Sequence, residues 1–259
     1  MASLISKGLR SRRWLLKDHN IYIPYYAAHV IGSYTMNRPD FAAKAVSQGV
    51  IPPLVELLRG RLTWVEQRVA VRAIGHITAF ESTFAAVAMH GEVLELAIEL
   101  ALNSLEIVYT QFIQSEDRRL KYHVDLLTRG GSRASSGRGR HIELRKGEEW
   151  ASQLQCWALQ LINCFAMKEK YLPIVCRPDF LAKLPSMWGG LVNEKSPAGI
   201  GLLLTICRHK IGRSYVAASP NIIQALCNTA RSSDDWQYMA VDCLLLLLVL
   251  VARLAAATV

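Results

Sequence analysis

Two short motifs in this chain each recur at nearly the same interval, and this periodicity restricts the fold more than any other feature. IGS at residues 31–33 returns as IGH at 74–76, and PDF at 178–180 returns as PNI at 220–222. The two intervals are 43 and 42 residues. A period of 40 to 47 residues is typical of chains built from stacked helical units. Ala, Leu, Val and Ile dominate the composition, which also favours helices. The sequence therefore predicts an all-α fold.

The stretch GVIPPLVELLRG, residues 49–60, indicates how one unit is built. Gly49 is expected to end a helix, because glycine readily adopts the left-handed conformation common at helix C-termini. Pro52 suits the first turn of the next helix, where its missing N–H is harmless. That helix is predicted to end at Gly60 and to bury Leu54, Val55, Leu57 and Leu58. One unit cannot bury all of its apolar faces alone, so neighbouring units are expected to stack.

The stretch YAAHVIGSYTMNRPDFAAKAVSQGVIPPLVELLRG resembles an armadillo repeat, and WVEQRVAVRAIGHIT resembles the long third helix of the next one. This resemblance is good over residues 22–105, whereas residues 150–250 match in period and apolar pattern only. Together with EEWASQLQCWALQLINCFA, the second stretch is also similar to a plant armadillo-like family. The resemblance implies a right-handed α-solenoid of armadillo/HEAT-like repeats.

The chain is predicted to divide into four parts. Residues 1–21 are a basic N-terminal segment, and residues 22–114 are armadillo-like repeats. Residues 115–149 are a basic, Gly/Ser-rich insertion, expected to be a solvated flexible link. Residues 150–259 are further repeats with an apolar C-terminal helix. Within the insertion, Ser136 is a candidate phosphorylation site because an arginine lies three residues before it.

The net charge of +9 lies almost entirely in two segments. Residues 1–17 and 129–146 together contain eleven basic residues and one acidic residue, so the rest of the chain is close to neutral. These segments permit an alternative function, in which the protein binds RNA or DNA through them. Residues 1–17 also suit an organelle transit peptide; otherwise we expect a cytoplasmic or nuclear protein.

The C-terminal sequence DCLLLLLVLVARLAAATV raises the question of a membrane helix. Its uninterrupted apolar run, residues 243–252, is only half of the roughly 20 residues that a spanning helix needs. A membrane role is therefore disfavoured. A helix that is apolar on all sides has to be covered, so oligomerisation through this helix stays open.

No sequence motif of a known catalytic or nucleotide-binding type is present, and we expect no enzyme activity and no cofactor. The six cysteines, at 156, 164, 176, 207, 227 and 243, lack the short paired spacing of a metal site. They are expected to be free thiols, and no metal is predicted.

The predicted function is that of a non-catalytic scaffold or adaptor that binds an extended peptide or a helix of a partner protein. In armadillo proteins the third helices line a concave surface, and importin-type members carry Trp and Asn there, four residues apart. The corresponding positions here are His29 and Ser33, then Arg72 and His76; Trp157 fits the Trp position, but Leu161 replaces the Asn. This departure disfavours nuclear-import cargo. The predicted protein-binding residues are His29, Ser33, Arg72, His76, Gln153 and Trp157.

Overall fold

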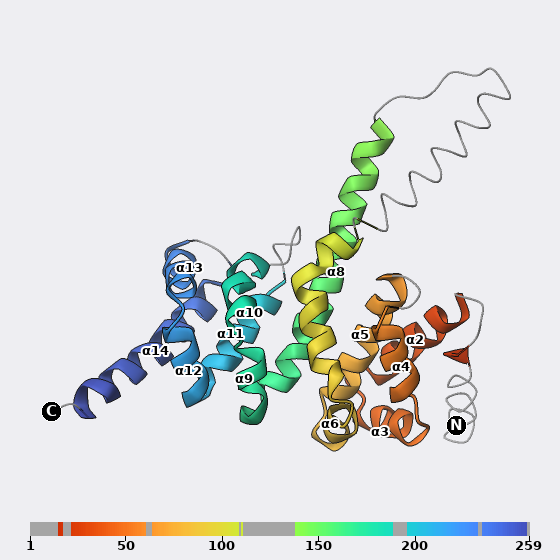
Figure 1. Cartoon of the computed structure of the whole chain (residues 1–259), viewed down its shortest axis with the longest axis horizontal. Coiled ribbons are helices and arrows are strands. Elements are labelled where there is room, and N and C mark those ends of the chain that lie inside the picture. The colour runs from red at the N-terminus through yellow and green to blue at the C-terminus, as the bar shows by residue number, and fades with distance from the viewer. Residues whose placement is uncertain are drawn as a thin grey trace.

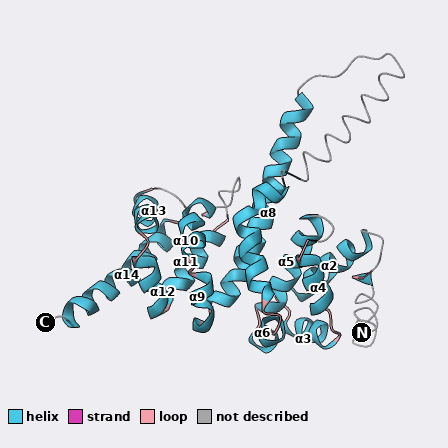
Figure 2. Cartoon of the chain, in the orientation of Figure 1, coloured by secondary structure: helices cyan, strands magenta, loops and turns pink. Residues whose placement is uncertain are grey.

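The computed structural model describes residues 15–17, 22–60, 64–108, 110, 138–188, 196–232 and 235–257. Within these ranges all regular secondary structure is helical (Figure 2). The predicted all-α class is therefore confirmed.

The helices follow a repeating order in which one helix of each unit packs on its counterpart in the next unit. These helices are α2 (Tyr22–Thr35), α5 (Trp64–Thr78), α8 (Arg138–Ala166), α11 (Ala198–Arg208) and α14 (Gln237–Ala257). Each corresponds to the third helix of an armadillo unit, and we call them the third helices.

The other helices lie between successive third helices along the chain. The first two intervals contain α3 (Pro39–Ser47) and α4 (Ile51–Leu58), then α6 (Glu81–Ala88) and a helix over residues 92–108. The third interval contains η1 (Glu169–Tyr171), α9 (Leu172–Val175), α10 (Pro178–Lys183) and η2 (Leu184–Met187). The last contains α12 (Lys210–Ala217) and α13 (Pro220–Arg231).

Successive third helices pack directly against each other, in the order α2, α5, α8, α11 and α14. They form one row through the molecule, with α2 and α14 at opposite ends of an elongated body (Figure 1). This arrangement is an α-solenoid, in which each unit buries its apolar faces against its neighbours.

The segment 49–60 forms the helix boundary that its sequence predicts. Gly49 has φ of 68° and Gly60 has φ of 74°, so both adopt the left-handed conformation that suits glycine. Between them α4 starts at Ile51 with prolines in its first turn. The predicted buried set, Leu54, Val55, Leu57 and Leu58, is confirmed as buried. Each of these side chains contributes roughly 1.5–3 kcal/mol by leaving water.

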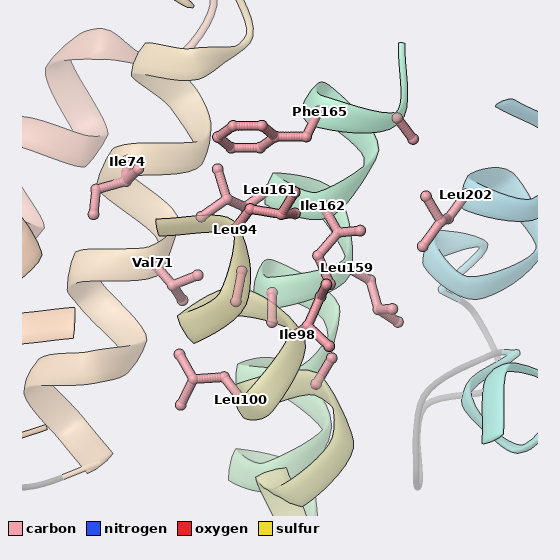
Figure 3. Close-up of a cluster of buried hydrophobic side chains, with 14 of the residues drawn as sticks. Val71, Ile74, Leu94, Ile98, Leu100, Leu159, Leu161, Ile162, Phe165 and Leu202 are labelled. Carbon is pink, nitrogen blue, oxygen red and sulfur yellow. The ribbon is translucent and has the colours of Figure 1, made fainter. Parts of the chain in front are cut away.

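The core is continuous from one unit to the next. Figure 3 shows apolar side chains from α5, residues 92–108, α8 and α11 gathered around α8. Ile74, Ile98 and Leu161 are fully buried there, as is Leu202 on the α11 side. Because α8 is apolar toward both neighbours, it cannot be stable alone and holds the two halves of the row together.

The predicted insertion, residues 115–149, has to be shortened at its C-terminal side. Helix α8 begins at Arg138, so residues 138–149 are helical instead of a flexible link. The segment ELRKGEEW within it consists mainly of good helix formers, which extend α8 toward its N-terminus. Residues 111–137, including Ser136, lie outside the described residues.

The apolar C-terminal helix α14 carries exposed apolar side chains. Leu245 is 55% exposed, Leu248 62% and Val249 45%. Among the described residues no helix combines the length and hydropathy needed to cross a membrane. Oligomerisation through α14 stays a prediction.

Candidate functional site

The exposed side of α2 presents the first two predicted residues. His29 and Ser33 are exposed and lie one helical turn apart. The Ser33 hydroxyl donates a hydrogen bond to the His29 carbonyl at 3.0 Å. This local bond satisfies the Ser33 donor within its own helix, whereas the His29 ring faces solvent and lies 6.2 Å from the ring of Tyr25.

A half-buried tryptophan marks the junction of α5 and α8. The centre of the Trp157 ring lies 5.4 Å from the guanidinium carbon of Arg72, a cation–π distance. The same ring lies 5.4 Å from that of His76, edge to face. Arg72 and His76 are one turn apart on α5, so both can contact a single side chain of α8.

The next turn toward the N-terminus of α5 makes a second contact between the same two helices. Arg68 donates a hydrogen bond to the side-chain oxygen of Gln153 at 2.8 Å. Beside it, the rings of Trp64 and Trp150 stack with centres 5.1 Å apart. We call Arg68, Arg72, His76, Gln153 and Trp157 the α5–α8 cluster.

A hollow of about 350 Å³ opens beside the α5–α8 cluster. Its lining comes from α5, α8 and α11 and includes Arg72, His76, Trp157, Gln160, Asn163, Cys164, Gly201 and Leu202. Two buried polar atoms of this lining, His76 Nε2 and Asn163 Oδ1, have no hydrogen-bond partner in the structure. Buried polar atoms are normally paired, so these two are exceptions beside the hollow.

Burial and charge set the protonation of the cluster. Burial, with a further effect from the Arg72 charge, lowers the pKa of His76 to about 4. His76 is therefore neutral near pH 7. Burial and the charge of Arg68 also lower the pKa of Arg72, although its guanidinium stays charged. The cluster thus carries two positive charges beside a neutral imidazole.

Four of the six predicted residues, Arg72, His76, Gln153 and Trp157, come together in this cluster. His29 and Ser33 lie on α2, the neighbouring helix of the row. Arg68, Gln160 and Asn163 are not among the residues that the sequence predicts. Arg68 could have been found, because it precedes Arg72 by one helical turn. Leu161, which replaces the expected Asn, is fully buried.

The chemistry of the described residues gives no sign of a catalytic centre. No group of three or more His, Cys, Asp or Glu residues in the described part is placed to hold a metal ion. All six cysteines are free, as predicted. Burial raises the pKa of Cys164, in the hollow, to about 11, so its thiol is a poor nucleophile near neutral pH.

A row of stacked three-helix units with this cluster on its third helices defines the chain as an armadillo-repeat solenoid. The family comparison agrees, because residues 1–177 match the plant ARM repeat family. The chain belongs to that family.

Among solved structures, the chain is similar to the designed armadillo repeat protein YIII(Dq)4CqI. The TM-score is 0.50 at 13% sequence identity, with 92% of this chain and 99% of the other covered. At this identity the likeness concerns the fold alone. The structural likeness covers more of the chain than residues 1–177, which match the family. No curated protein matches the chain.

The basic segments of the alternative function lie mostly outside the described residues. Of residues 1–17 only 15–17 are described, and of 129–146 only the helical backbone from 138 onward. Nucleic-acid binding and organelle targeting through them stay predictions.

Proposed function

We propose that this chain is a protein-binding scaffold, and that the exposed face of its third helices binds an extended segment or a helix of a partner protein. Armadillo solenoids typically serve as non-enzymatic scaffolds that present a long concave surface. The observation that supports the proposal most is Trp157, which lies half-buried between Arg72 and His76 at the edge of the hollow.

A tryptophan in this position suits an anchor for a partner. Binding energy at protein interfaces concentrates in a few residues, and Trp and Arg are enriched among them. The Trp157 ring is already held by α5, so little side-chain entropy is lost when a partner covers it. The hollow beside it offers space for a partner side chain.

The polar residues of this face suit contacts with a peptide backbone. Gln153 and Gln160 are exposed on α8, and His29 is exposed on α2. Amide and imidazole groups can donate to and accept from main-chain groups of an extended segment. The proposed binding residues are therefore His29, Ser33, Arg72, His76, Gln153 and Trp157, joined by Arg68 and Gln160.

Quantitative affinity capture with variants tests this function. The baits are the full chain, Trp157→Ala, and Met89→Ala as a control, because Met89 is 85% exposed and lies outside the third helices. We expect one set of partner proteins to be retained by the full chain and by Met89→Ala, and to be lost with Trp157→Ala. Circular dichroism and thermal unfolding establish that each bait is folded.

Equal retention by folded Trp157→Ala would contradict the proposal. One result would favour the nucleic-acid alternative: nuclease and deletion of residues 129–146 both abolish capture, whereas Trp157→Ala leaves it unchanged.

A further inference from the structure

The α5–α8 cluster contains two arginines that no carboxylate of the described chain neutralises. Arg68 contacts the neutral amide of Gln153 and the ring of Trp64. Arg72 contacts the ring of Trp157. Neither forms an ion pair with a described residue. The pKa of Arg72 is lowered by burial and by Arg68, which is opposite to the effect of a nearby carboxylate.

The neighbouring helices supply no counter-charge either. Helices α2 and α11 contain no acidic residue, and Glu66, the acidic residue of α5, is buried. Helix α8 itself carries Glu148 and Glu149, which are exposed and form no ion pair with either arginine.

Elsewhere, Arg177 pairs with both Glu95 and Asp179. Arg208 and Arg231, at the ends of α11 and α13, form no ion pair with a described residue. Arg68 and Arg72 differ from these two because they lie one helical turn apart on α5, and together they give the third-helix face a positive patch.

Two residues that line the adjacent hollow each hold a polar atom without a hydrogen-bond partner among the described residues. Asn163 Oδ1 can only accept a hydrogen bond, and it is buried without a donor. His76 Nε2 is buried without a partner on a ring that is neutral near pH 7. A ligand side chain with a donor group, such as a hydroxyl or an amide, would satisfy these atoms and remove the cost of leaving them unpaired.

We propose that the segment bound by this face carries an Asp or Glu side chain that pairs with Arg68 and Arg72, next to a hydrogen-bonding side chain that enters the hollow. The proposal rests on the protein-binding function above and gives it a sequence preference. The guanidinium groups offer a carboxylate the two-pronged contact that arginine makes best.

Two other anionic ligands fit the same patch less well. A phosphorylated side chain has three acceptor oxygens and about two charges, whereas one of the two arginines already donates to Gln153. Nucleic acid is held by contacts with many phosphates, and the described third-helix face offers this single pair of arginines at the cluster.

A displayed library of random twelve-residue peptides, selected against the full chain, tests the preference. The strongest peptides are then synthesised, and their affinities are measured for the full chain, Arg72→Gln and Arg231→Gln. Arg231 is an exposed arginine at the end of α13 and serves as the matched control. Thermal unfolding verifies that all three proteins fold.

We expect selected peptides to be enriched in Asp or Glu at one position. Arg72→Gln should weaken their binding by about ten- to a hundredfold, and Arg231→Gln should leave it unchanged. Replacing the Glu of a selected peptide by Gln should weaken its binding to the full chain by a similar factor. The same replacement should have little effect on binding to the Arg72→Gln variant, because the two changes remove the same contact.

Three results would overturn the preference. Peptides without acidic enrichment that bind Arg72→Gln as tightly as the full chain would remove the acidic preference. If the same peptides fail to bind a folded Trp157→Ala variant, the binding face stays in place. Much tighter binding of a phosphoserine version than of the Glu peptide would assign the patch to phosphate. Failure to select any peptide that competes at this face would contradict both this inference and the proposed function.

Discussion

At the scale of single residues, Gly212 determines the tight turn from α11 into α12. A Cβ atom at this position would lie 2.0 Å from the carbonyl oxygen of Ile206, which belongs to the helix backbone and cannot move aside. We expect Gly212→Ala to lower the free energy of unfolding by about 3 kcal/mol. Urea denaturation measures this change.

Gly201 is the matched control for that substitution. It lies inside α11, and a Cβ atom there would meet no heavy atom within 4 Å. Gly201→Ala should therefore raise the free energy of unfolding by about 0.5–1 kcal/mol through helix propensity. Equal effects of the two substitutions would contradict the packing described for the turn.

A second residue-scale prediction concerns His76. Its folded-state pKa of about 4 lies below the ordinary value of about 6.5, so the unfolded state binds more protons between these values. The contribution of neutral His76 to stability is fully present above about pH 6.5 and is lost as the pH falls toward 4. NMR titration should place the midpoint of this imidazole well below 5.

Urea unfolding of His76→Gln provides the control. The full chain should lose more stability than this variant between about pH 7 and pH 4.5, since other groups titrate alike in both. An NMR midpoint above about 6, or equal losses in the two proteins, would show that His76 is not desolvated in the folded chain.

The sequence predicts part of the α5–α8 cluster because α-helical spacing is regular. Arg72 and His76 could be identified from their four-residue spacing on an expected third helix. The same step from Trp157 leads to Leu161, which is buried. Steps of three and four residues turn 300° and 400°, so they lead to opposite sides of the Trp157 direction. Here the three-residue step reaches the exposed side at Gln160, and the four-residue step reaches the buried side at Leu161. Which residues leave polar atoms unpaired depends on packing with α5 and α11, and no single sequence pattern reveals this.

At the scale of helices, Arg213 stabilises the C-terminal end of α11. It is nearly buried and donates hydrogen bonds to the carbonyls of Cys207 at 2.8 Å and Arg208 at 3.2 Å. These are among the last carbonyls of the helix, which have no partner within it. A positive charge there also opposes the helix dipole favourably.

Replacement of Arg213 by Met should therefore lower the free energy of unfolding by about 1.5–3 kcal/mol, measured by urea denaturation. Arg208→Met is the control, because Arg208 is exposed at the end of the same helix. It should change stability by no more than about 0.5 kcal/mol. Similar losses for both variants would mean that Arg213 does not cap α11.

Helix boundaries differ in how well the sequence predicts them. At residues 49–60, the glycines at both ends suit helix C-termini and the two prolines suit the first turn of a helix, so the sequence locates these boundaries closely. The start of α8 has no such residues: Gly137 and Gly139 favour a loop, whereas the segment ELRKGEEW that follows consists mainly of good helix formers. Helix propensity beyond the two glycines thus extends α8 further toward its N-terminus than the sequence pattern predicts.

At the scale of the whole molecule, the row of third helices continues beyond the part that resembles its family. The family match ends at residue 177, yet α11 packs on α8, and α14 packs on α11. The second half keeps the repeat period and the apolar faces but not the armadillo motifs. Burial needs only apolar side chains at the right spacing, so the fold persists where specific residues differ.

The most direct test of the account places a photo-crosslinking amino acid on the third-helix face. Gln160, exposed at the hollow, is replaced by p-benzoylphenylalanine in the full chain, and Gln224, exposed on α13, is replaced in a control. The crosslinked peptides are identified by mass spectrometry. We expect position 160 to crosslink reproducibly to one segment of a partner protein, and we expect no such crosslink from position 224. Partner crosslinks from position 224 with none from position 160 would contradict a binding face on the third helices.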